Sequence, residues 1–218
     1  AQKVQEMMRM REGDIFVDIG CNDGTLFRFV DPKIVRIGFD PNDYKEESGQ
    51  YADLIINNYF NHREYKKAKH GHKKAKAITS IAMFYDLEDP HSFVEDVRKT
   101  LDRNGLWIIQ MSYLPLMLKQ LAFDNICHEH LEYYGLTSLK YLLDAHALDV
   151  VDCELNDVNG GSFRIYIRHR AADPTTFATA PYRDVARMRV DSILGHEKSL
   201  ALHKKKIHMD FWKDIDAL

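Results

Sequence analysis

The chain has 218 residues, of which 45% are hydrophobic and 29% charged, and its formal net charge at pH 7 is -3. This length fits one domain, or one domain with an appendage. The composition is that of a globular protein and excludes general disorder, collagen-like repeats and a disulfide scaffold. The small acidic excess argues against a dedicated nucleic-acid binder, which is more often basic.

The three cysteines, Cys21, Cys127 and Cys153, are far apart and form no CxxC pair. This pattern excludes a Cys-rich zinc module and favours a reducing, cytoplasmic location. No apolar run approaches the ~20 residues of a membrane-spanning helix, and the polar N-terminal stretch does not resemble a signal peptide. Because the chain begins with Ala rather than Met, we expect a processed protein or a fragment of a longer one.

Strand and helix patterns alternate along the first half of the chain, which predicts an α/β fold with a largely parallel sheet. Short apolar runs predict strands over 14–19, 35–39, 53–57, 77–82 and 106–111. A helix is expected to begin near Thr25. Apolar residues at helical spacing predict another over 91–101, with Asp89-Pro90 as its start signal and Asn104-Gly105 as its stop signal.

This alternation ends after the fifth strand. The segment 112–136 contains the stretch FDNICHEHLEYYGL, and a helix is predicted over 137–147. Two strands over 149–155 and 162–168 are expected to be antiparallel neighbours at one sheet edge, because the NDVNGG between them suits a tight connection. A Pro/Thr/Ala linker covers 171–181, and 182–218 is predicted to form one or two long charged helices.

The turn after the first strand, VDIGCNDG, is the first candidate site. Gly20 and Gly24 permit positive φ angles and close approach of the backbone to a ligand. Asp40 follows the second strand, where a carboxylate can accept hydrogen bonds from ribose hydroxyls. The spacing is neither GxGxxG nor GxxxxGK[ST], which disfavours NAD binding and P-loop chemistry. The residues leave two interpretations open: a nucleoside-type cofactor across Gly20 and Asp40, or an ordinary turn followed by a capped helix.

VDIGCNDGTLF, followed by GFDP, resembles motif I and the acidic loop of class I S-adenosylmethionine-dependent methyltransferases. The resemblance implies a Rossmann-like sandwich around a mostly parallel seven-stranded sheet with an antiparallel edge strand. It also implies that S-adenosylmethionine is the cofactor, with its methionine end at the glycine turn, its ribose at Asp40 and its adenine near residues 58–60. The implied cofactor contacts are Asp18, Gly20, Cys21, Asn22, Gly24, Asp40, Ala82, Met83 and Phe84.

The second candidate site is the His-Glu-His (HEH) segment, Cys127-His128-Glu129-His130. A histidine can act as a general base near neutral pH, and a nearby carboxylate can tune it. In an extended stretch, His128 and His130 would share one face, with Glu129 opposite, whereas in a helix the two histidines would diverge by ~200°. Three interpretations remain open: a hydrogen-bonded surface loop, a metal site that has two histidine ligands but no evident third, and acid–base catalysis above a cofactor.

FDNICHEHLEYYGLTSLKYLL, with the later NGGSFRIYIRH, is similar to sugar C-methyltransferases that act on nucleotide-linked keto-deoxysugars. The similarity spans about residues 1–170. It implies that a histidine removes the proton next to the sugar ketone and that the enolate then attacks the methyl group of the cofactor. The implied catalytic residues are His130 as the base, Glu129 as the residue that orients or tunes it, and His128 as a second candidate base, with no metal ion. The implied substrate contacts are Cys127, Tyr133, Asn159 and Arg164.

Two positions depart from this family, because Cys127 and Asn159 stand where it often has Tyr and His. Such enzymes also usually carry an N-terminal zinc-binding module and a C-terminal nucleotide-sugar-binding domain, which these residues do not include. We therefore expect a methyltransferase domain over 1–170, with its substrate segment at 112–136, and a linker and helical extension over 171–218. The expected partner is a small-molecule acceptor, a sugar, and neither nucleic acid nor a membrane.

Two other functions remain possible. In an O- or N-methyltransferase, the same histidine would deprotonate a hydroxyl or an amine. In a non-catalytic methyltransferase-fold domain, the chain would serve in binding or assembly. The six lysines within 66–76 could attract phosphate groups, but such a charge run is more typical of a solvated surface.

Overall fold

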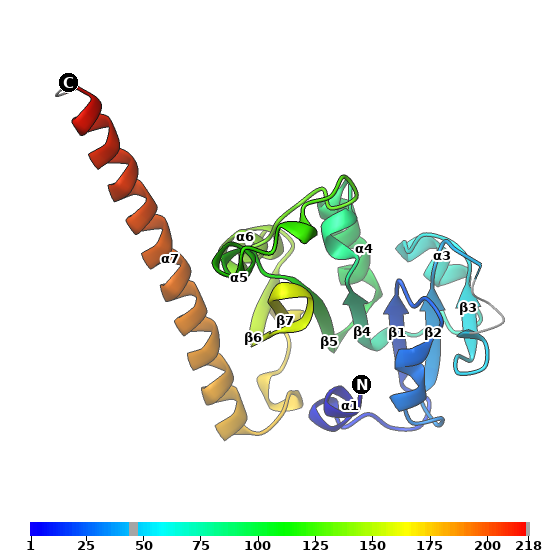
Figure 1. The fold of residues 1–218 in the computed structure, drawn as a ribbon. Coiled ribbons are helices and arrows are strands. Elements are labelled where there is room, and N and C mark those ends of the chain that lie inside the picture. Colours follow the sequence, from blue (N-terminus) through cyan, green and yellow to red (C-terminus); the bar gives the residue numbers. More distant parts are fainter. Residues whose placement is uncertain (44–47, 217–218) are drawn as a thin grey trace.

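The computed structural model describes the backbone of residues 1–43 and 48–216, and the side chains of these residues up to position 201. The described chain forms one seven-stranded sheet in the order β3-β2-β1-β4-β5-β7-β6 (Figure 1). The strands are β1 (Ile15–Ile19), β2 (Val35–Phe39), β3 (Leu54–Ile56), β4 (Ala75–Ile81), β5 (Leu101–Ser112), β6 (Leu148–Asn156) and β7 (Ser162–His169).

All neighbouring strands from β3 to β5 are parallel, and β7 is antiparallel to both β5 and β6. The sheet therefore confirms the predicted architecture, with the reversed strand β7 between β5 and the edge strand β6. Strand β1 is buried along its whole length, as expected for a parallel strand that is covered on both faces.

Strand β5 begins earlier than predicted. Ala75 pairs with Leu101 and Ala77 with Leu106, so residues 102–105 bulge out of the ladder while the strand continues. The sequence had suggested Asn104-Gly105 as the stop signal of the preceding helix. These two residues instead lie inside the bulged strand. That helix, α4 (Pro90–Thr100), stops just before the strand begins.

Helices cover both faces of the sheet. In Figure 1, α3 (His62–Lys67), α4 and α6 (Leu136–Asp144) lie above the sheet and α1 (Gln2–Met8) lies below it. Helix α4 begins as its sequence predicts, because the Asp89 carboxylate accepts a hydrogen bond from the Ser92 N–H (3.0 Å) and Pro90 occupies the first turn. The helix expected near Thr25 is only the short 3₁₀ helix η1 (Thr25–Phe29), since Pro32 follows within a few residues.

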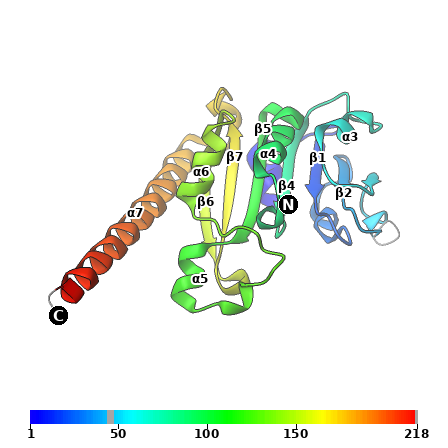
Figure 2. The same cartoon turned by 90° about the horizontal axis from the view of Figure 1, so that it is seen from above.

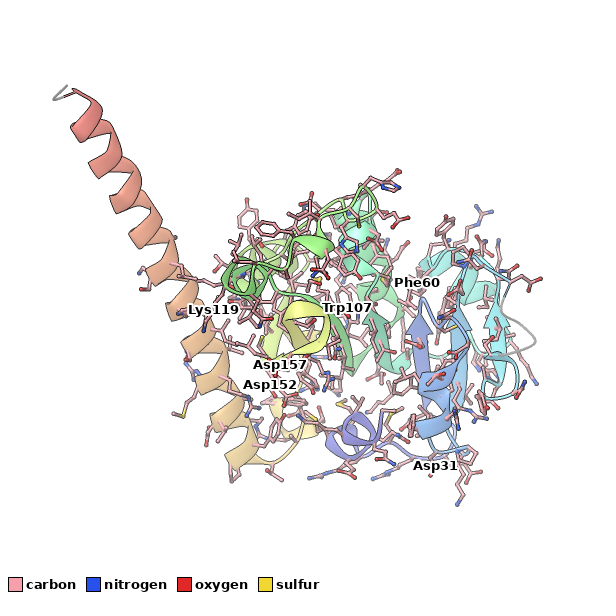
Figure 3. The ribbon with its side chains drawn as sticks, in the orientation of Figure 1. Asp31, Phe60, Trp107, Lys119, Asp152 and Asp157 are labelled. Atoms are coloured by element: carbon pink, nitrogen blue, oxygen red, sulfur yellow. The ribbon has the colours of Figure 1, made fainter. Side chains whose placement is uncertain are left out.

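Two hydrophobic clusters fill the space between the sheet and these helices. The larger cluster lies under α4 and α6, and its centre is Trp107, whose ring packs near Phe84 and Phe93 (Figure 3). The indole N–H of Trp107 donates to the hydroxyl of Ser80 (3.1 Å), so the buried polar group is satisfied. The smaller cluster lies under α1 and contains Phe16 and Phe27.

The chain after β7 passes through η5 (Pro174–Thr176) and ends in α7 (Ala180–Asp216), a single long helix. Its first turns pack against β6 and α6, and the rest projects beyond the sheet (Figures 1 and 2). The buried Asp152 accepts hydrogen bonds from both Arg189 and Tyr182 (Figure 3). Glu197 accepts the Leu136 and Thr137 N–H groups at the start of α6. These contacts tie α7 to the rest of the fold. The expected domain division at residue 170 stays a prediction.

Within the described residues, no helix is both long enough and apolar enough to cross a membrane.

Candidate active site

A cavity of about 820 Å³ opens at the carboxyl ends of β1, β2 and β4. Its volume lies in the range of small-molecule sites. The chain continues from β1 to β2 on one side and reaches β4 on the other, so the cavity lies at the switch point where open α/β sheets bind ligands. Its lining includes Asp18, Gly20, Asn22, Asp40, Asn58, Tyr59, Phe60, Ala82, Met83 and Asp86.

The glycine turn forms one wall of this cavity. Gly20 has φ +73°, a region that disfavours residues with a Cβ, and its N–H donates to the Phe39 carbonyl (2.8 Å). A Cβ on Gly20 would stand 3.3 Å from Cγ of Met83 on the opposite wall. The turn therefore stays tight and close to β2 because this position is glycine.

Asp40 joins the turn after β1 to the turn after β2. Its carboxylate accepts the N–H of Asn22 (2.9 Å) and the N–H of Asn42 (2.9 Å), and the side chain is 5% exposed. The side-chain amide of Asn57 donates to the main-chain carbonyls of residues 40–42, at 2.7 Å for Asn42. Each carboxylate oxygen retains a lone pair, so Asp40 presents a fixed acceptor to a ligand in the cavity.

Asp18 is the deepest carboxyl group of this wall. Burial raises its pKa to about 7, although the Thr79 hydroxyl at 2.6 Å from Oδ1 acts in the opposite direction. The Asp40 carboxylate raises the pKa further. Near neutral pH this group is therefore poised between its two protonation states, and a cationic ligand nearby would favour the ionised one.

We expect Asp18 to make the free protein less stable as the pH rises through 7. Its folded pKa of about 7 exceeds the ~3.9 of an unfolded aspartate, so the native state binds more protons between these values. The stabilisation by protonated Asp18 is complete below pH 4 and lost above pH 7, and it amounts to about 4 kcal/mol in total, at ~1.36 kcal/mol per pKa unit. Urea unfolding of Asp18→Asn and the wild type from pH 4 to 8 should show this slope only in the wild type; parallel curves would contradict it.

The cavity carries strong negative charge. Its described lining contains the aspartates Asp18, Asp40, Asp86, Asp89 and Asp96 but no lysine, arginine or histidine. Such a field attracts a cation and opposes a phosphate-bearing ligand. This negative charge disfavours the binding of a dinucleotide such as NAD. The glycine motif alone does not predict it, because most of the aspartates come from other segments of the chain.

Most, but not all, of the expected cofactor contacts line the cavity. Asp18, Gly20, Asn22, Asp40, Ala82 and Met83 do, and so do residues 58–60. The Cys21 side chain instead lies under Gly38 in the smaller cluster, where burial raises the pKa of its thiol to about 12. Phe84 is fully buried in the larger cluster, and Gly24 packs against Ser48. These three residues support the cavity wall from behind.

The HEH segment is a turn, which is neither of the two conformations, extended or helical, that were considered from the sequence. The N–H of His130 donates to the Cys127 carbonyl (3.3 Å), which closes the chain over His128 and Glu129. The His128 side chain is 92% exposed and lies 3.9 Å from the Glu129 carboxylate, which is itself 73% exposed. The two histidines therefore do not share a face, because turn geometry replaces the two-residue alternation of a strand.

His130 is the half-buried histidine of the pair. Its ring centroid lies 4.3 Å from that of Tyr85, with the two rings tilted by 53°, and Nδ1 lies 2.8 Å from the Asn125 carbonyl oxygen. A carbonyl only accepts hydrogen bonds, so in the neutral ring Nδ1 carries the hydrogen and Nε2 keeps its lone pair. The backbone fixes the tautomer that a general base requires.

The backbone of this segment is bonded directly to the cavity wall. The N–H groups of Leu131 and Glu132 both donate to the Tyr85 carbonyl (3.0 and 3.1 Å), and the next residue, Asp86, lines the cavity. Burial raises the pKa of Asp86, while the nearby His130 lowers it. His130 therefore lies beside the cavity, at the side of η2 (Phe84–Asp86).

Asn125, in η3 (Phe123–Asn125), connects the two sequence motifs, and sequence reasoning missed it. Its amide nitrogen donates to the Asn159 carbonyl (3.1 Å), and its amide oxygen accepts the Ser112 hydroxyl (3.2 Å). Its carbonyl oxygen also receives the hydroxyl of Tyr133 (3.3 Å). Tyr85 and Asp86 were missed as well. No local pattern marks these three residues; only their contacts in the folded chain do.

The remaining expected substrate contacts lie farther from the cavity. The Arg164 side chain bonds to the Gln110 amide oxygen (2.8 Å) and lies 3.9 Å from Glu154, on the α1 side of the sheet. Asn159 meets Asn125 through its carbonyl, and Cys127 is half-buried beside the turn. Neither Arg164 nor Asn159 lines the cavity. Across the described residues, no three His, Cys, Asp or Glu side chains are arranged to hold a metal ion.

Comparison with known proteins agrees with this geometry. The family of methyltransferase domains matches residues 1–152. The chain belongs to the methyltransferase domain family. Its mostly parallel seven-stranded sheet is the one that the motif I resemblance implied, so the predicted family and fold class are confirmed.

Among individual methyltransferases, the chain is 32% identical over 174 residues to C-methyltransferase NovU of Streptomyces niveus. The match covers 77% of this chain but only 40% of NovU, so the chain spans less than half the length of this relative.

Solved methyltransferases share the fold at low sequence identity. The putative methyltransferase in complex with the Haloferax volcanii Trm112 activator has a TM-score of 0.58 at 14% identity, over 77% of this chain and 88% of that one. The plantazolicin methyltransferase BpumL, solved with SAH, has a TM-score of 0.56 at 12% identity, over 78% of this chain and 80% of that one. These likenesses concern the fold.

Proposed function

We propose that this methyltransferase domain transfers the methyl group of S-adenosylmethionine to a carbon next to the ketone of a sugar. The observation that carries the proposal is the placement of His130. A histidine with a fixed Nδ1–H and a free Nε2 lone pair lies beside an acidic cavity at the switch point of the sheet. The similarity to C-methyltransferase NovU supports carbon as the methylated atom.

The cavity suits the charge and shape of the cofactor. The methionine end carries an ammonium group and a sulfonium, and both cations are favoured by the five aspartates of the lining. Asp40 offers the ribose hydroxyls a carboxylate that is already fixed by two backbone N–H groups. The adenine ring would lie between Phe60 and the exposed Tyr59, which both line the cavity.

The chemistry requires one proton transfer and one methyl transfer. Nε2 of His130 takes the proton from the carbon next to the ketone, and the electrons of that C–H bond form an enolate. The bound cofactor supplies an activated methyl group, which needs no further activation beyond positioning. The new C–C bond forms as the S–CH₃ bond breaks, and its electron pair stays on sulfur. The Glu129 side chain is 73% exposed, and the contact that holds the His130 ring is the one between Nδ1 and the Asn125 carbonyl.

Calorimetric titration tests the cofactor assignment. We expect micromolar binding of S-adenosylmethionine, weakened about 5–150-fold in Asp40→Ala by the loss of ~1–3 kcal/mol of hydrogen bonding. The same charge change at the exposed Asp157 should have no effect, and NAD should not bind. Saturable NAD binding, or no binding of S-adenosylmethionine, would overturn the assignment.

Isotope labelling tests the methylated atom. With a ¹³C-methyl cofactor and a panel of keto sugars, the product methyl should resonate as a carbon-bound group that couples to a sugar carbon. A methyl signal typical of attachment to oxygen or nitrogen would instead show O- or N-methylation. Cofactor binding without turnover on any acceptor would favour a non-catalytic binding domain.

A further inference from the structure

A second cavity, of about 660 Å³, lies at the other edge of the sheet. It is enclosed by the first turns of α7, the edge strand β6 and the end of β7. The carboxyl end of the reversed strand β7 lies at the amino ends of the parallel strands, where His169 approaches the Leu101 carbonyl at the start of β5. The first cavity therefore lies at the carboxyl ends of the parallel strands and the second near their amino ends, and the two share no lining residue.

The charge of this cavity is opposite to that of the first. Five cationic side chains line it but only two carboxylates, Asp149 and Asp191. The cationic residues are Lys140, Arg168, Arg170, Arg183 and Arg187.

Three of these cations are already engaged within the fold. The buried Arg168 gives its donors to the carbonyls of residues 104, 105 and 173 and to the Thr176 hydroxyl. Arg170 is paired with Asp144 and Asp149, and Lys140 lies 3.2 Å from Asp144. These side chains supply positive charge but few free donors.

Arg183 and Arg187 differ from the other three. They stand four residues apart on α7, so their side chains are neighbours on one helix face. Nη1 of Arg183 donates to the carbonyls of Phe177 and Ala178, which leaves its other N–H donors open. Burial lowers the pKa of Arg168, and the positive charge of Arg183 also lowers it. No described carboxylate lies within ion-pair distance of either guanidinium.

The rest of the lining is apolar and includes Val150, Val151, Pro174, Val190 and Leu194. We propose that this cavity binds a phosphate-bearing small molecule, with its phosphates between Arg183 and Arg187. Guanidinium groups bind phosphate through paired N–H donors, and an organic portion would lie on the apolar wall. This proposal does not depend on the function of the first cavity.

Calorimetric titrations with uridine diphosphate, inorganic pyrophosphate and uridine test the proposal. We expect saturable binding of the two phosphate compounds and at least tenfold weaker binding of uridine. Tighter binding of uridine diphosphate than of pyrophosphate would assign the apolar wall to an organic group, and equal binding would assign the site to free phosphate compounds. Backbone amides of Val150, His169 and Val190 should shift in NMR spectra on saturation.

Arg183→Gln/Arg187→Gln should weaken phosphate binding at least tenfold. The exposed Arg187 has no hydrogen bond in the described part of the chain, so Arg187→Gln alone should fold normally and still lose several-fold in affinity. Lys66→Gln/Lys67→Gln removes the same charge from the far side of the sheet and should leave the affinity unchanged, as should Asp40→Ala. No saturable binding, equal loss in the lysine control, or full affinity in the double arginine variant would overturn the proposal.

Discussion

His130→Ala is expected to remove almost all methyl transfer while leaving the affinity for S-adenosylmethionine unchanged. A positioned general base contributes roughly 10²–10⁴-fold to a rate, and no other described imidazole is held against the wall of η2. The cavity lining does not include His130, so its removal should not disturb the cofactor. The measurement is kcat on a keto-sugar acceptor, together with calorimetric titration of the cofactor.

His128→Ala distinguishes the two histidines of the HEH segment. The His128 side chain is 92% exposed, and its loss should change kcat no more than about twofold. A larger loss in His128→Ala than in His130→Ala would reverse the assignment of the base. Asn125→Ala adds an independent test. Alanine keeps the main-chain carbonyl that bonds to Nδ1 of His130 but loses the side-chain bonds to Asn159 and Ser112 that hold this carbonyl in place. The substitution should therefore alter the pH profile of kcat more than the stability of the protein.

Gly161→Ala is expected to destabilise the domain by about 2–5 kcal/mol. Gly161 has φ +107°, and a Cβ there would stand 2.5 Å from Cβ of Leu116 in α5 (Leu114–Gln120). The backbone conformation costs a residue with a Cβ ~1–2 kcal/mol, and overpacking costs typically 1–3 kcal/mol more. Urea unfolding measures the change. The substitution also pushes the loop of Asn159 away from Asn125 and the base.

Two other glycines separate these contributions. Gly13 also has a positive φ (+79°) but nothing within 4 Å, so Gly13→Ala should show the conformational cost alone, about 1–2 kcal/mol. Gly195 lies inside α7 in open space, and Gly195→Ala should stabilise the protein by about 0.5–1 kcal/mol. If Gly161→Ala cost no more than Gly13→Ala, the close packing of this loop under α5 would be contradicted.

The strands and the cofactor turn were predictable because local sequence determines them. Apolar runs that end at glycine or at Asp-Pro predict β1 and β2, and each of these two strands lies within two residues of its predicted range. The positive φ angles at Gly20 and Gly24 are ones that glycine permits without strain. Asp40 was predictable because the residue after a parallel strand must face the carboxyl edge of the sheet.

The placement of His130 was not predictable in the same way. Two-residue alternation applies only to extended chains, and residues 127–130 form a turn. The partner that fixes His130 is a main-chain carbonyl, which has no signature in the amino-acid sequence. Cys21 was not predictable either. It lies within the cofactor turn, but its side chain points into the core against Gly38 and not into the cavity.

The sequence by itself determined the family, the strands and the chemistry-bearing motifs of this protein, since each depends on residue types a few positions apart. Only the tertiary structure decided which histidine lies beside the cavity, that Asn125 connects the two motifs, and that the two cavities have opposite charge. The aspartates of the first cavity lie in or directly beside β1, β2, η2 and α4, and the arginines of the second lie in or directly beside β7 and α7. Charges so distant along the chain act together only after the sheet has brought their elements to one edge.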